Sequence, residues 1–511
     1  MPHARFFSSA TCLLALWHMG SVQPHNSAGA VEITITDKAT GKPIACRLHV
    51  KDAAGKPQRA AKWPFWHDHF VCPGNVSLDL AMGEYTYECE RGPEYTLRKG
   101  AFTVAAKGPA KLSIELERLA DLAGEGWWSG ELHIHRPLDD IQLLMKAEDL
   151  HVAPVITWWN GRNLWNDRKL PAELLVRFDG NHYYHMMAGE DEREGGALLY
   201  FHLPRPLAIT EASREYPSPL QFVAEACKQK GVWIDVEKPF WWDMPTWVAS
   251  GHVDSIGLAN NHMCRSQMSE TEAWGKPRVV ERLPAPLGNG YWTQEIYYHL
   301  LNCGLRLPPS AGSASGVLPN PVGYNRVYVH VENRFDDDQW WEGLRAGRSF
   351  VTNGPLLRVE ADGKLPGHVF TTAEGKEVTI ALKAHLTTSD SIRTLDVIKD
   401  GQVERAVPFE TWRERGTLGT VTFKRSGWFL VRVIANNPKT FRFASTAPFY
   451  VEVGEGKRCV SKASARFFRE WVRERAERIK LADVKQREDV LQYHTAAERF
   501  WQGLVDHANA E

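Results

Sequence analysis

The middle of the chain, residues 126–354, alternates between two hydrophobic patterns, and this alternation limits the possible folds more than any other feature. Apolar runs typical of buried strands occupy residues 152–157 and 232–236. Between such runs, residues 139–150 and 220–230 place apolar side chains at helical spacing. Strands that alternate with helices usually pair in parallel, because each helix returns the chain to the same edge of the sheet. The pattern therefore predicts βα units around a parallel sheet or barrel.

The segments on either side of this region have the pattern of β-structure. Residues 31–119 contain short alternating strands separated by turns, which is typical of a small β-sandwich. Residues 356–455 return to the same pattern and predict a second sandwich. Residues 456–511 are charged, with apolar side chains at helical spacing, and predict a helical tail. The predicted fold class is α/β, with residues 120–355 between two β-sandwich domains.

The start of the chain resembles an export signal, with Arg5 ahead of a short apolar stretch and small residues at 28–30. The apolar stretch is too short to cross a bilayer, and no other segment reaches the required length. Residues 1–30 are therefore predicted to be a signal peptide, and the protein to be secreted or periplasmic with no membrane span. The formal net charge of −1 lacks the basic excess expected of a nucleic-acid-binding protein.

A His-x-His pair lies in the stretch GWWSGELHIH, residues 126–135. Side chains alternate along a strand, so His133 and His135 would project from one face while Leu132 and Ile134 point into the core. Two imidazoles on one face can chelate one metal ion. An isolated pair of this kind more often forms hydrogen bonds to its neighbours, which is the alternative here. The surrounding βα pattern favours ligation.

Polar residues recur where the predicted central strands end. In βα barrels the chemistry takes place at the carboxyl ends of the strands. The candidates at these ends are His133, His135, Asn160, Glu190, Asp235, Glu237, Asn261 and His262. Their recurrence predicts one site at that edge of the sheet.

The chain has 20 tryptophans, and several of them come in pairs on loops after predicted strands. Indole faces stack well on sugar rings and on aromatic substrates. Trp158, Trp159, Trp241 and Trp242, together with Asn160 and Asn261, are therefore predicted to bind substrate. The alternative is that each ring packs against a flanking domain, which is the more common role of a single tryptophan.

Several motifs together resemble a known family. GWWSGELHIH, AGEDE, GRSFVTNGPLL, VGYNRVYV and ASTAPFYVEV resemble the polymerase-and-histidinol-phosphatase (PHP) superfamily, and within it the carbaryl-hydrolase-like metallohydrolases. The resemblance implies a distorted (β/α)7 barrel of about seven βα units, a divalent metal and hydrolysis of an ester, amide, carbamate or phosphoester bond. Residues 31–119 resemble the carboxypeptidase-regulatory, transthyretin-like modules of secreted enzymes, which usually act as spacers or packing partners.

The resemblance carries over to only some of the metal ligands. His133 and His135 match the first metal motif, and Glu190 matches the glutamate that usually bridges two metals. The histidine that follows in the family corresponds to His202 or to Ala197. Other motifs are changed, since the family's Thr-Asp-His appears here as TWWN, its Ser-Asp-x-His as GSAS and its His-Pro as EKP. These losses imply one Zn or Mn ion instead of a cluster, with Glu237 or His262 completing the ligand set.

Three functions follow from these features. The first is a secreted metal-dependent hydrolase of an ester, amide, phosphoester or glycosidic bond, which acts through a metal-activated water with Glu237 or Asp235 as base and His262 as a second acid–base group. The second is a carbohydrate-processing enzyme in which the tryptophan loops bind sugar and carboxylates such as Asp235, Glu237 or Asp243 act in pairs. The third is a degenerate PHP-like protein that binds a glycan without chemistry. The expected partner is a small molecule or a glycan.

Overall fold

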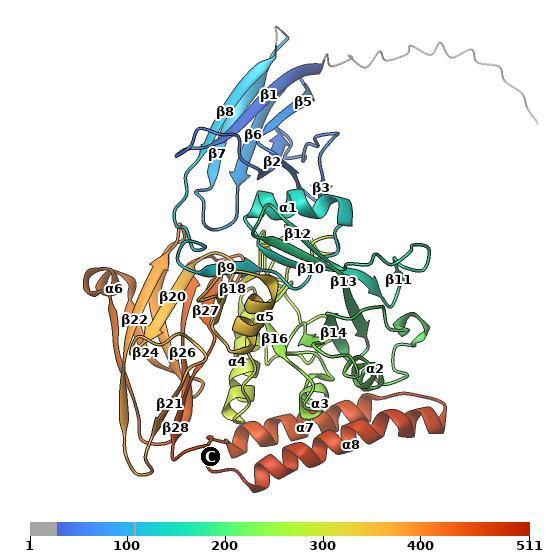
Figure 1. Ribbon diagram of the computed structural model, residues 1–511, viewed down its shortest axis with the longest axis vertical. Helices are drawn as coiled ribbons and strands as arrows, with labels where there is room; N and C mark the ends of the chain where they lie inside the picture. The colour runs from blue at the N-terminus through green and yellow to red at the C-terminus, as the bar shows by residue number, and fades with distance from the viewer. Residues whose placement is uncertain (1–27, 107–108) are drawn as a thin grey trace, which may run out of the picture.

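The computed structural model describes residues 28–106 and 109–511 and shows a sheet-rich, mixed α/β protein (Figure 1). The predicted mixed α/β class is confirmed, with eight α-helices in the described part of the chain. The predicted signal peptide falls on residues 1–27, which lie outside that part, and on residues 28–30, which begin strand β1 (Ala28–Asp37). None of the described helices is both long and apolar enough to cross a membrane.

The N-terminal module consists of two sheets that bury one hydrophobic cluster between them. Its strand β5 alternates exposed and buried residues, so Val76, Leu78 and Leu80 point inward, as the period of two in the sequence predicts. One sheet has the order β5-β1-β8, with β5 (Asn75–Ala81) and β8 (Ala110–Leu116). The other has the order β3-β4-β2-β6-β7, with β2 (Cys46–Asp52), β3 (Phe65–Trp66), β4 (His69–Cys72), β6 (Gly83–Glu90) and β7 (Arg98–Val104).

The central region holds a mixed sheet, where the sequence predicted a parallel one. Its strands are β9 (Trp127–Gly130), β10 (Val152–Trp159), β13 (His182–Arg193), β14 (Gly196–Phe201), β15 (Trp233–Val236), β16 (Ser255–Ala259) and β17 (Pro309–Ala311). β10 pairs in parallel with β13, and β16 pairs in parallel with β15 and β17, but β14 runs antiparallel to both of its neighbours. Only Glu194 and Gly195 separate β13 from β14, and a link that short allows a hairpin but no crossover.

Helices connect or cover these strands. The helices predicted at residues 139–150 and 220–230 are confirmed as α1 (Ile141–Glu148) and α2 (Pro219–Ala226). Three more are α3 (Met244–Ala249), α4 (Gly288–Asn302) and α5 (Asp337–Arg345). Two short strands, β11 (Arg162–Asn163) and β12 (Leu175–Phe178), extend the outer side of β10 and β13.

The segment at residues 131–135, which carries both histidines of the His-x-His pair, lies between two edges of the central sheet. On one side, the backbone N–H of Ile156 in β10 donates to the carbonyl oxygen of Ile134 at 2.8 Å. On the other side, Leu132 N–H donates to Ala311 and His135 N–H donates to Ser315, at 2.9 and 2.8 Å. With this segment in place, the strand pairings from β10 through β13, β14, β15 and β16 to β17 form a closed circuit.

The C-terminal region continues the central sheet and adds a second layer. β18 (Arg326–His330) pairs with β9 and with β19 (Ser349–Thr352), which in turn pairs with β27 (Phe443–Thr446). A separate three-stranded sheet contains β20 (Leu356–Ala361), β22 (Val378–Thr387) and β25 (Thr417–Phe423). One hydrophobic cluster lies between it and the remaining strands. These are β21 (Val369–Thr372), β23 (Ile392–Lys399), β24 (Gln402–Pro408), β26 (Gly427–Ala435) and β28 (Phe449–Val453), with α6 (Phe409–Arg415) after β24.

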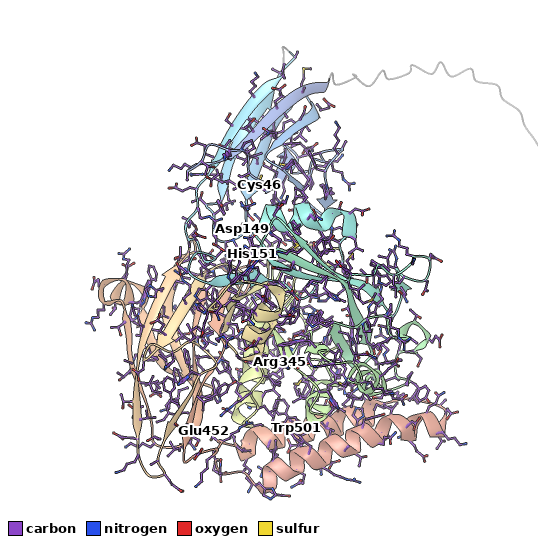
Figure 2. All side chains as sticks on the ribbon, viewed as in Figure 1. Cys46, Asp149, His151, Arg345, Glu452 and Trp501 are labelled. Atoms are coloured by element: carbon purple, nitrogen blue, oxygen red, sulfur yellow. The ribbon has the colours of Figure 1, made fainter. Side chains whose placement is uncertain are left out.

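The helical tail is an antiparallel pair, α7 (Lys462–Arg478) and α8 (Val484–Asp506), that packs beneath the central region (Figure 1). Trp501 on α8 is fully buried where the tail meets α3, and its indole N–H donates to Pro245 O at 3.0 Å (Figure 2). Arg475 on α7 donates to Asp243 at 2.7 Å and to Glu215, and its side chain is 3% exposed. The tail is therefore held by apolar packing and by a buried charge group.

Replacing Arg475 with Met should destabilise the attachment of the tail. The change leaves the buried Asp243 with His494 alone and the half-buried Glu215 without its counter-charge, so we expect a loss of about 3–5 kcal/mol in the free energy of unfolding. Urea unfolding followed by tryptophan fluorescence measures it. Arg473→Met on the same helix is the matched control, because the half-exposed Arg473 pairs with Glu498 at the surface and should cost less than about 1 kcal/mol. Equal losses of stability in the two variants would contradict the role of Arg475 in holding the tail.

The effect of Arg475→Met should also depend on pH. Burial alone would raise the pKa of Asp243, but the charges of Arg475 and His494 hold it well below its usual range. A carboxyl whose pKa is depressed by folding stabilises the fold above its unfolded value of about 4, and loses that contribution at lower pH. The difference between wild type and variant should therefore shrink as the pH falls below about 4.

Candidate metal centre

Three predicted metal ligands from two separate elements converge on one point. His133 and His135 extend from the segment at residues 131–135, and Glu190 extends from β13. The two histidine Nε2 atoms are 3.0 Å apart. Glu190 places Oε1 at 3.4 Å from His133 Nε2 and Oε2 at 3.1 Å from His135 Nε2. All three side chains are buried, so the structure brings together the group that the sequence predicted.

The chemistry of this group suits a divalent cation. Two imidazoles and one carboxylate form a known ligand set for a catalytic zinc ion that keeps an open position. Burial disfavours charge on His133, but the carboxylates of Glu190 and Glu237 raise its pKa to about 10. Burial alone would raise the pKa of Glu190, yet the neighbouring His133 and His135 hold it well below its usual range. The group therefore favours a positive charge at its centre, which a metal ion can supply.

Glycine allows the loop after β17 to approach the histidines. A Cβ atom on Gly312 would overlap the Cβ of His133, and one on Gly316 would overlap the carbonyl oxygen of His135. Glu131, which lies two residues before His133, accepts the backbone N–H groups of Ser313 and Gly323. The GSAS stretch at residues 312–315 thus contributes close backbone packing beside the two histidines.

His133, His135 and Glu190 are called the metal group below. Glu237 is next to this group but is held as a positioning residue. Its Oε1 lies 3.2 Å from His133 Nδ1 and accepts from Asn261 at 2.6 Å, and its Oε2 accepts from the indole N–H of Trp241 at 3.0 Å. The ammonium of Lys238 contacts both oxygens. Burial would raise the pKa of Glu237, but the charge of Lys238 lowers it to about 2. These contacts favour orientation of His133 over the predicted role of general base.

Sequence reasoning missed two residues next to this group, Glu192 and Lys238. Glu192 lies within ligand distance of Glu190 and Glu237, and its side chain is half-buried. Burial and the charge of Glu190 raise the pKa of Glu192 to about 7. The period of two along a strand places Glu192 on the same face as Glu190, so the AGEDE motif contained the signal. Lys238 had no comparable signal, because its role depends on a buried contact with its own neighbour.

The other predicted catalytic residues lie beside the metal group with different partners. Asp235 accepts hydrogen bonds from Ser255 at 2.5 Å and from Ser310, and burial raises its pKa to about 7. His262 packs on the ring of Phe240, and burial lowers its pKa to about 3. Neither residue belongs to a ligand group in the described part of the chain.

His202 and Asn160 also have structural partners. The ring of His202 packs against Trp341 and His185, and its Nδ1 lies 3.2 Å from Gly231 O, so it is outside the metal group that the sequence predicted for it. Asn160 donates to Asp191 at 2.7 Å and accepts from the backbone N–H of Glu192 at 2.6 Å. Asn160 thus fixes the end of the strand that carries Glu190, where the sequence predicted substrate binding.

A cavity of about 170 Å³ opens beside His135. One wall carries His135, Thr157 and Trp159, and the ring of Trp159 meets the His135 ring edge-on at a centroid distance of 5.4 Å. The remaining wall residues are Arg136, Pro137, Leu138, Asp139, Ile156, Arg162, Leu164 and Arg168. Three arginines against one aspartate give this cavity a basic wall next to the metal group.

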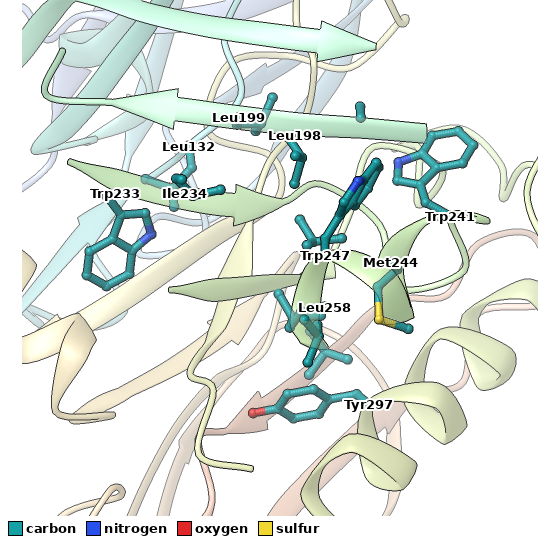
Figure 3. Packing of buried hydrophobic residues seen from close by; sticks show 14 of the residues in the cluster. Leu132, Leu198, Leu199, Trp233, Ile234, Trp241, Met244, Trp247, Leu258 and Tyr297 are labelled. Atoms are coloured by element: carbon teal, nitrogen blue, oxygen red, sulfur yellow. The ribbon is translucent and has the colours of Figure 1, made fainter. Parts of the chain in front are cut away.

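Most of the tryptophans predicted to bind substrate are core residues. Trp158 and Trp241 are each 1% exposed, and Trp242 is 6% exposed where it packs against the tail. Figure 3 shows Trp241 among packed apolar side chains with Trp247 and Met244 nearby. These three rings are therefore buried where the sequence predicted exposed loops, because β14 packs on Trp158 and Trp241 and α7 packs on Trp242. Trp159 remains at the cavity.

Comparison with known proteins finds no matching family and only weak structural likenesses. The sequence matches no family model and no curated protein. The Bacillus anthracis TIE protein is matched over 22% of this chain and 20% of its own, with 22% identity and a TM-score of 0.15. The N-terminal four immunoglobulin domains of Dscam1 isoform 8.4 are matched over 84% and 73%, with 8% identity and a TM-score of 0.15. The match to the TIE protein spans about a fifth of that protein, and neither likeness informs the fold or the site.

Gly312→Ala should destabilise the protein because the new methyl group overlaps His133. We expect a cost of about 1–3 kcal/mol, the usual range for overpacking. Gly503→Ala on α8 is the matched control, since a methyl group there would meet no atom within 4 Å beyond its own helix backbone, and alanine favours a helix by about 0.5–1 kcal/mol. Denaturant unfolding of both variants measures the difference. A Gly312→Ala protein as stable as wild type would show that the loop does not press on the histidine.

Asp235→Asn should change how stability depends on pH. Folding raises the pKa of Asp235, so its contribution is present at low pH and is lost as the pH rises through about 7. An asparagine keeps the size of the side chain and does not titrate. We therefore expect the wild type to lose on the order of 1 kcal/mol relative to the variant between pH 6 and pH 8. Parallel stability profiles over this range would contradict the buried, protonated state.

Proposed function

We propose that the protein is a metal-dependent hydrolase that holds one zinc or manganese ion on His133, His135 and Glu190. The observation that carries this proposal is the convergence of three donor groups from two elements within 3.4 Å of one another in a buried site. A buried carboxylate and two imidazoles at this separation are costly for a fold unless a cation or a proton pairs them. Three protein ligands leave a position open for a reacting group.

The strand arrangement supports the resemblance to the PHP superfamily. The closed circuit of pairings around residues 131–135 is compatible with the distorted (β/α)7 barrel that the resemblance implies. In such a barrel the antiparallel β14 would be one of the distortions. The His-x-His pair and Glu190 meet where the strands end, as in barrel enzymes. Export of the enzyme remains a prediction from the sequence.

The residues around the ion have separable roles. When bound, the ion supplies a Lewis acid that polarises the scissile group and lowers the pKa of water. Glu237 orients His133 through Nδ1, and Lys238 balances the charge of Glu237. Glu192 is the half-buried carboxylate of the group and is placed to hold or pass a proton. The cavity beside His135 would hold a small substrate, with Trp159 against an apolar part and the arginines near an anionic or polar part.

The carbohydrate-processing alternative has less support. It requires paired carboxylates at a sugar site, but Asp243 is bound to Arg475 and His494 at the tail, and Asp235 is bound to two serines. Three of the four tryptophans that would stack on sugar are buried. A non-catalytic glycan-binding protein would need the same surfaces. Both alternatives are tested by the experiment below.

The decisive experiment measures metal content and turnover together. The full-length protein is stripped with a chelator, reloaded with Zn²⁺ or Mn²⁺ and tested on chromogenic esters, amides, phosphoesters and glycosides. We expect turnover that requires metal and is reduced at least a hundredfold in His135→Ala and Glu190→Gln, because each change removes a ligand. Loss of activity in these variants should be matched by loss of the bound ion.

His202→Gln is the matched control for this experiment. His202 is a histidine of the same region that the structure places outside the metal group, so its replacement should leave metal content and turnover close to wild type. A protein that binds no metal after reloading, or whose activity survives His135→Ala, would overturn the proposal. Glycan binding without turnover of any substrate would favour the non-catalytic alternative.

A further inference from the structure

A second group of potential ligands lies in the N-terminal module, on elements that do not contribute to the central site. His49 is on β2, His69 begins β4, and Asp68 lies in the two-residue turn between β3 and β4. Both histidines are buried, and the side chain of Asp68 is 23% exposed. Their donor atoms lie within ligand distance of one another.

The strand register explains why these side chains meet. β2 and β4 are antiparallel, with Arg47 opposite Val71 and Leu48 opposite Phe70. The next step of the same register places His49 opposite His69, so both imidazoles project from one face. This face is directed away from the module's core, which contains Leu48 and Phe70, and toward α1 of the central region.

The geometry of the group resembles a coordination shell more than a satisfied hydrogen-bond network. The Nδ1 atoms of His49 and His69 each lie 3.2 Å from the same oxygen of Asp68, Oδ1. Neighbouring ligand atoms around a tetrahedral zinc ion are separated by roughly 3.3 Å, given bond lengths near 2.0 Å. His69 is aligned for a hydrogen bond to Asp68, whereas both ring nitrogens of the buried His49 lack a hydrogen-bond partner among the described residues. A buried imidazole with two unpaired nitrogens is costly unless a ligand completes it.

We propose that His49, Asp68 and His69 form a second metal site, which binds a zinc-like divalent cation. Two imidazoles and one carboxylate supply three ligands, and the partial exposure of Asp68 leaves room for a water molecule as the fourth. The site is independent of the proposed hydrolase centre, since the two share no residue.

Two basic side chains, Lys51 and Arg47, lie near this site, and neither needs to compete with a bound ion. Lys51 has its Nζ at 3.8 Å from Asp68 Oδ2, and its side chain is 42% exposed. An exposed lysine can swing into solvent when an ion binds. Arg47 lies on the same face of β2, but it is paired with Glu90 and Glu148. Its charge is therefore already balanced.

A bound ion at this site would stabilise contacts between the N-terminal module and the central region. The β3–β4 hairpin that carries Asp68 and His69 also carries Trp66, whose indole N–H donates to Leu318 O at 2.7 Å. Arg136, next to His135, donates to Phe65 O in the same hairpin at 3.3 Å. An ion that joins the hairpin to β2 would hold these two contacts against the loops around the central site.

The test counts zinc in the full-length protein. Wild type and variants are stripped with a chelator, reloaded with ZnCl₂, desalted and measured by elemental analysis. We expect two equivalents in wild type, one in Asp68→Asn, one in Glu190→Gln and none in the double variant. Asp68 lies in a turn where asparagine is well tolerated, so this variant should fold. Lys51→Met is the matched control and should retain both equivalents.

The outcomes separate this proposal from the proposed hydrolase. If Glu190→Gln retains no zinc while Asp68→Asn equals wild type, the second site does not exist, whatever the central site does. If Asp68→Asn loses one equivalent while Glu190→Gln loses none, the second site stands and the central one fails. His49→Gln checks the assignment of the imidazole, and it should lose the same equivalent as Asp68→Asn with an unchanged circular dichroism spectrum. Retention of that equivalent in a folded His49→Gln protein would overturn the site.

Discussion

Two-sided backbone pairing of residues 131–135 is the constraint on which the central region depends. The segment uses its N–H and C=O groups toward β10 on one side and toward residues 311–315 on the other. Backbone groups that are paired on both sides fix the direction of each side chain, because successive residues alternate between faces. This pairing directs His133 and His135 toward the face on which Glu190 lies. Gly312 and Gly316 are needed because a side chain there would force the two backbones apart.

Charge balance is the second constraint, and it explains why the buried carboxylates cluster. Glu190, Glu192 and Glu237 lie within a few ångströms of one another, and Lys238 is the cation bound directly to one of them. Carboxylates that share a site repel each other strongly in a low-dielectric interior. Lys238 compensates Glu237, which leaves Glu190 to the two imidazoles. A divalent ion between them would complete the balance more fully than a shared proton.

The sequence predicted what depends on local periodicity and missed what depends on the opposing surface. The sequence predicted the His-x-His strand, Glu190 and helices α1 and α2, because alternation and helical spacing report which face is buried. The strand β14 was missed altogether, and with it the antiparallel pairing that the short link at Glu194 and Gly195 allows. The burial of Trp158, Trp241 and Trp242 could not be predicted, since periodicity does not reveal which distant strand or helix covers a ring. The hydrogen bonds of Glu237 to Asn261 and Trp241 could not be predicted for the same reason.

The N-terminal module is joined tightly to the central region, which fits the packing-partner role that its resemblance implies better than the spacer role. Arg47 pairs with Glu148 at the end of α1, and Arg91 pairs with Asp149 just beyond it, near His151 and the start of β10 (Figure 2). Buried ion pairs tolerate little displacement, because separation leaves charges without partners in a low-dielectric interior. The end of α1 leads directly into β10, which pairs with the segment that carries the histidines. The module thereby restrains the strand on which the geometry of the candidate metal centre depends.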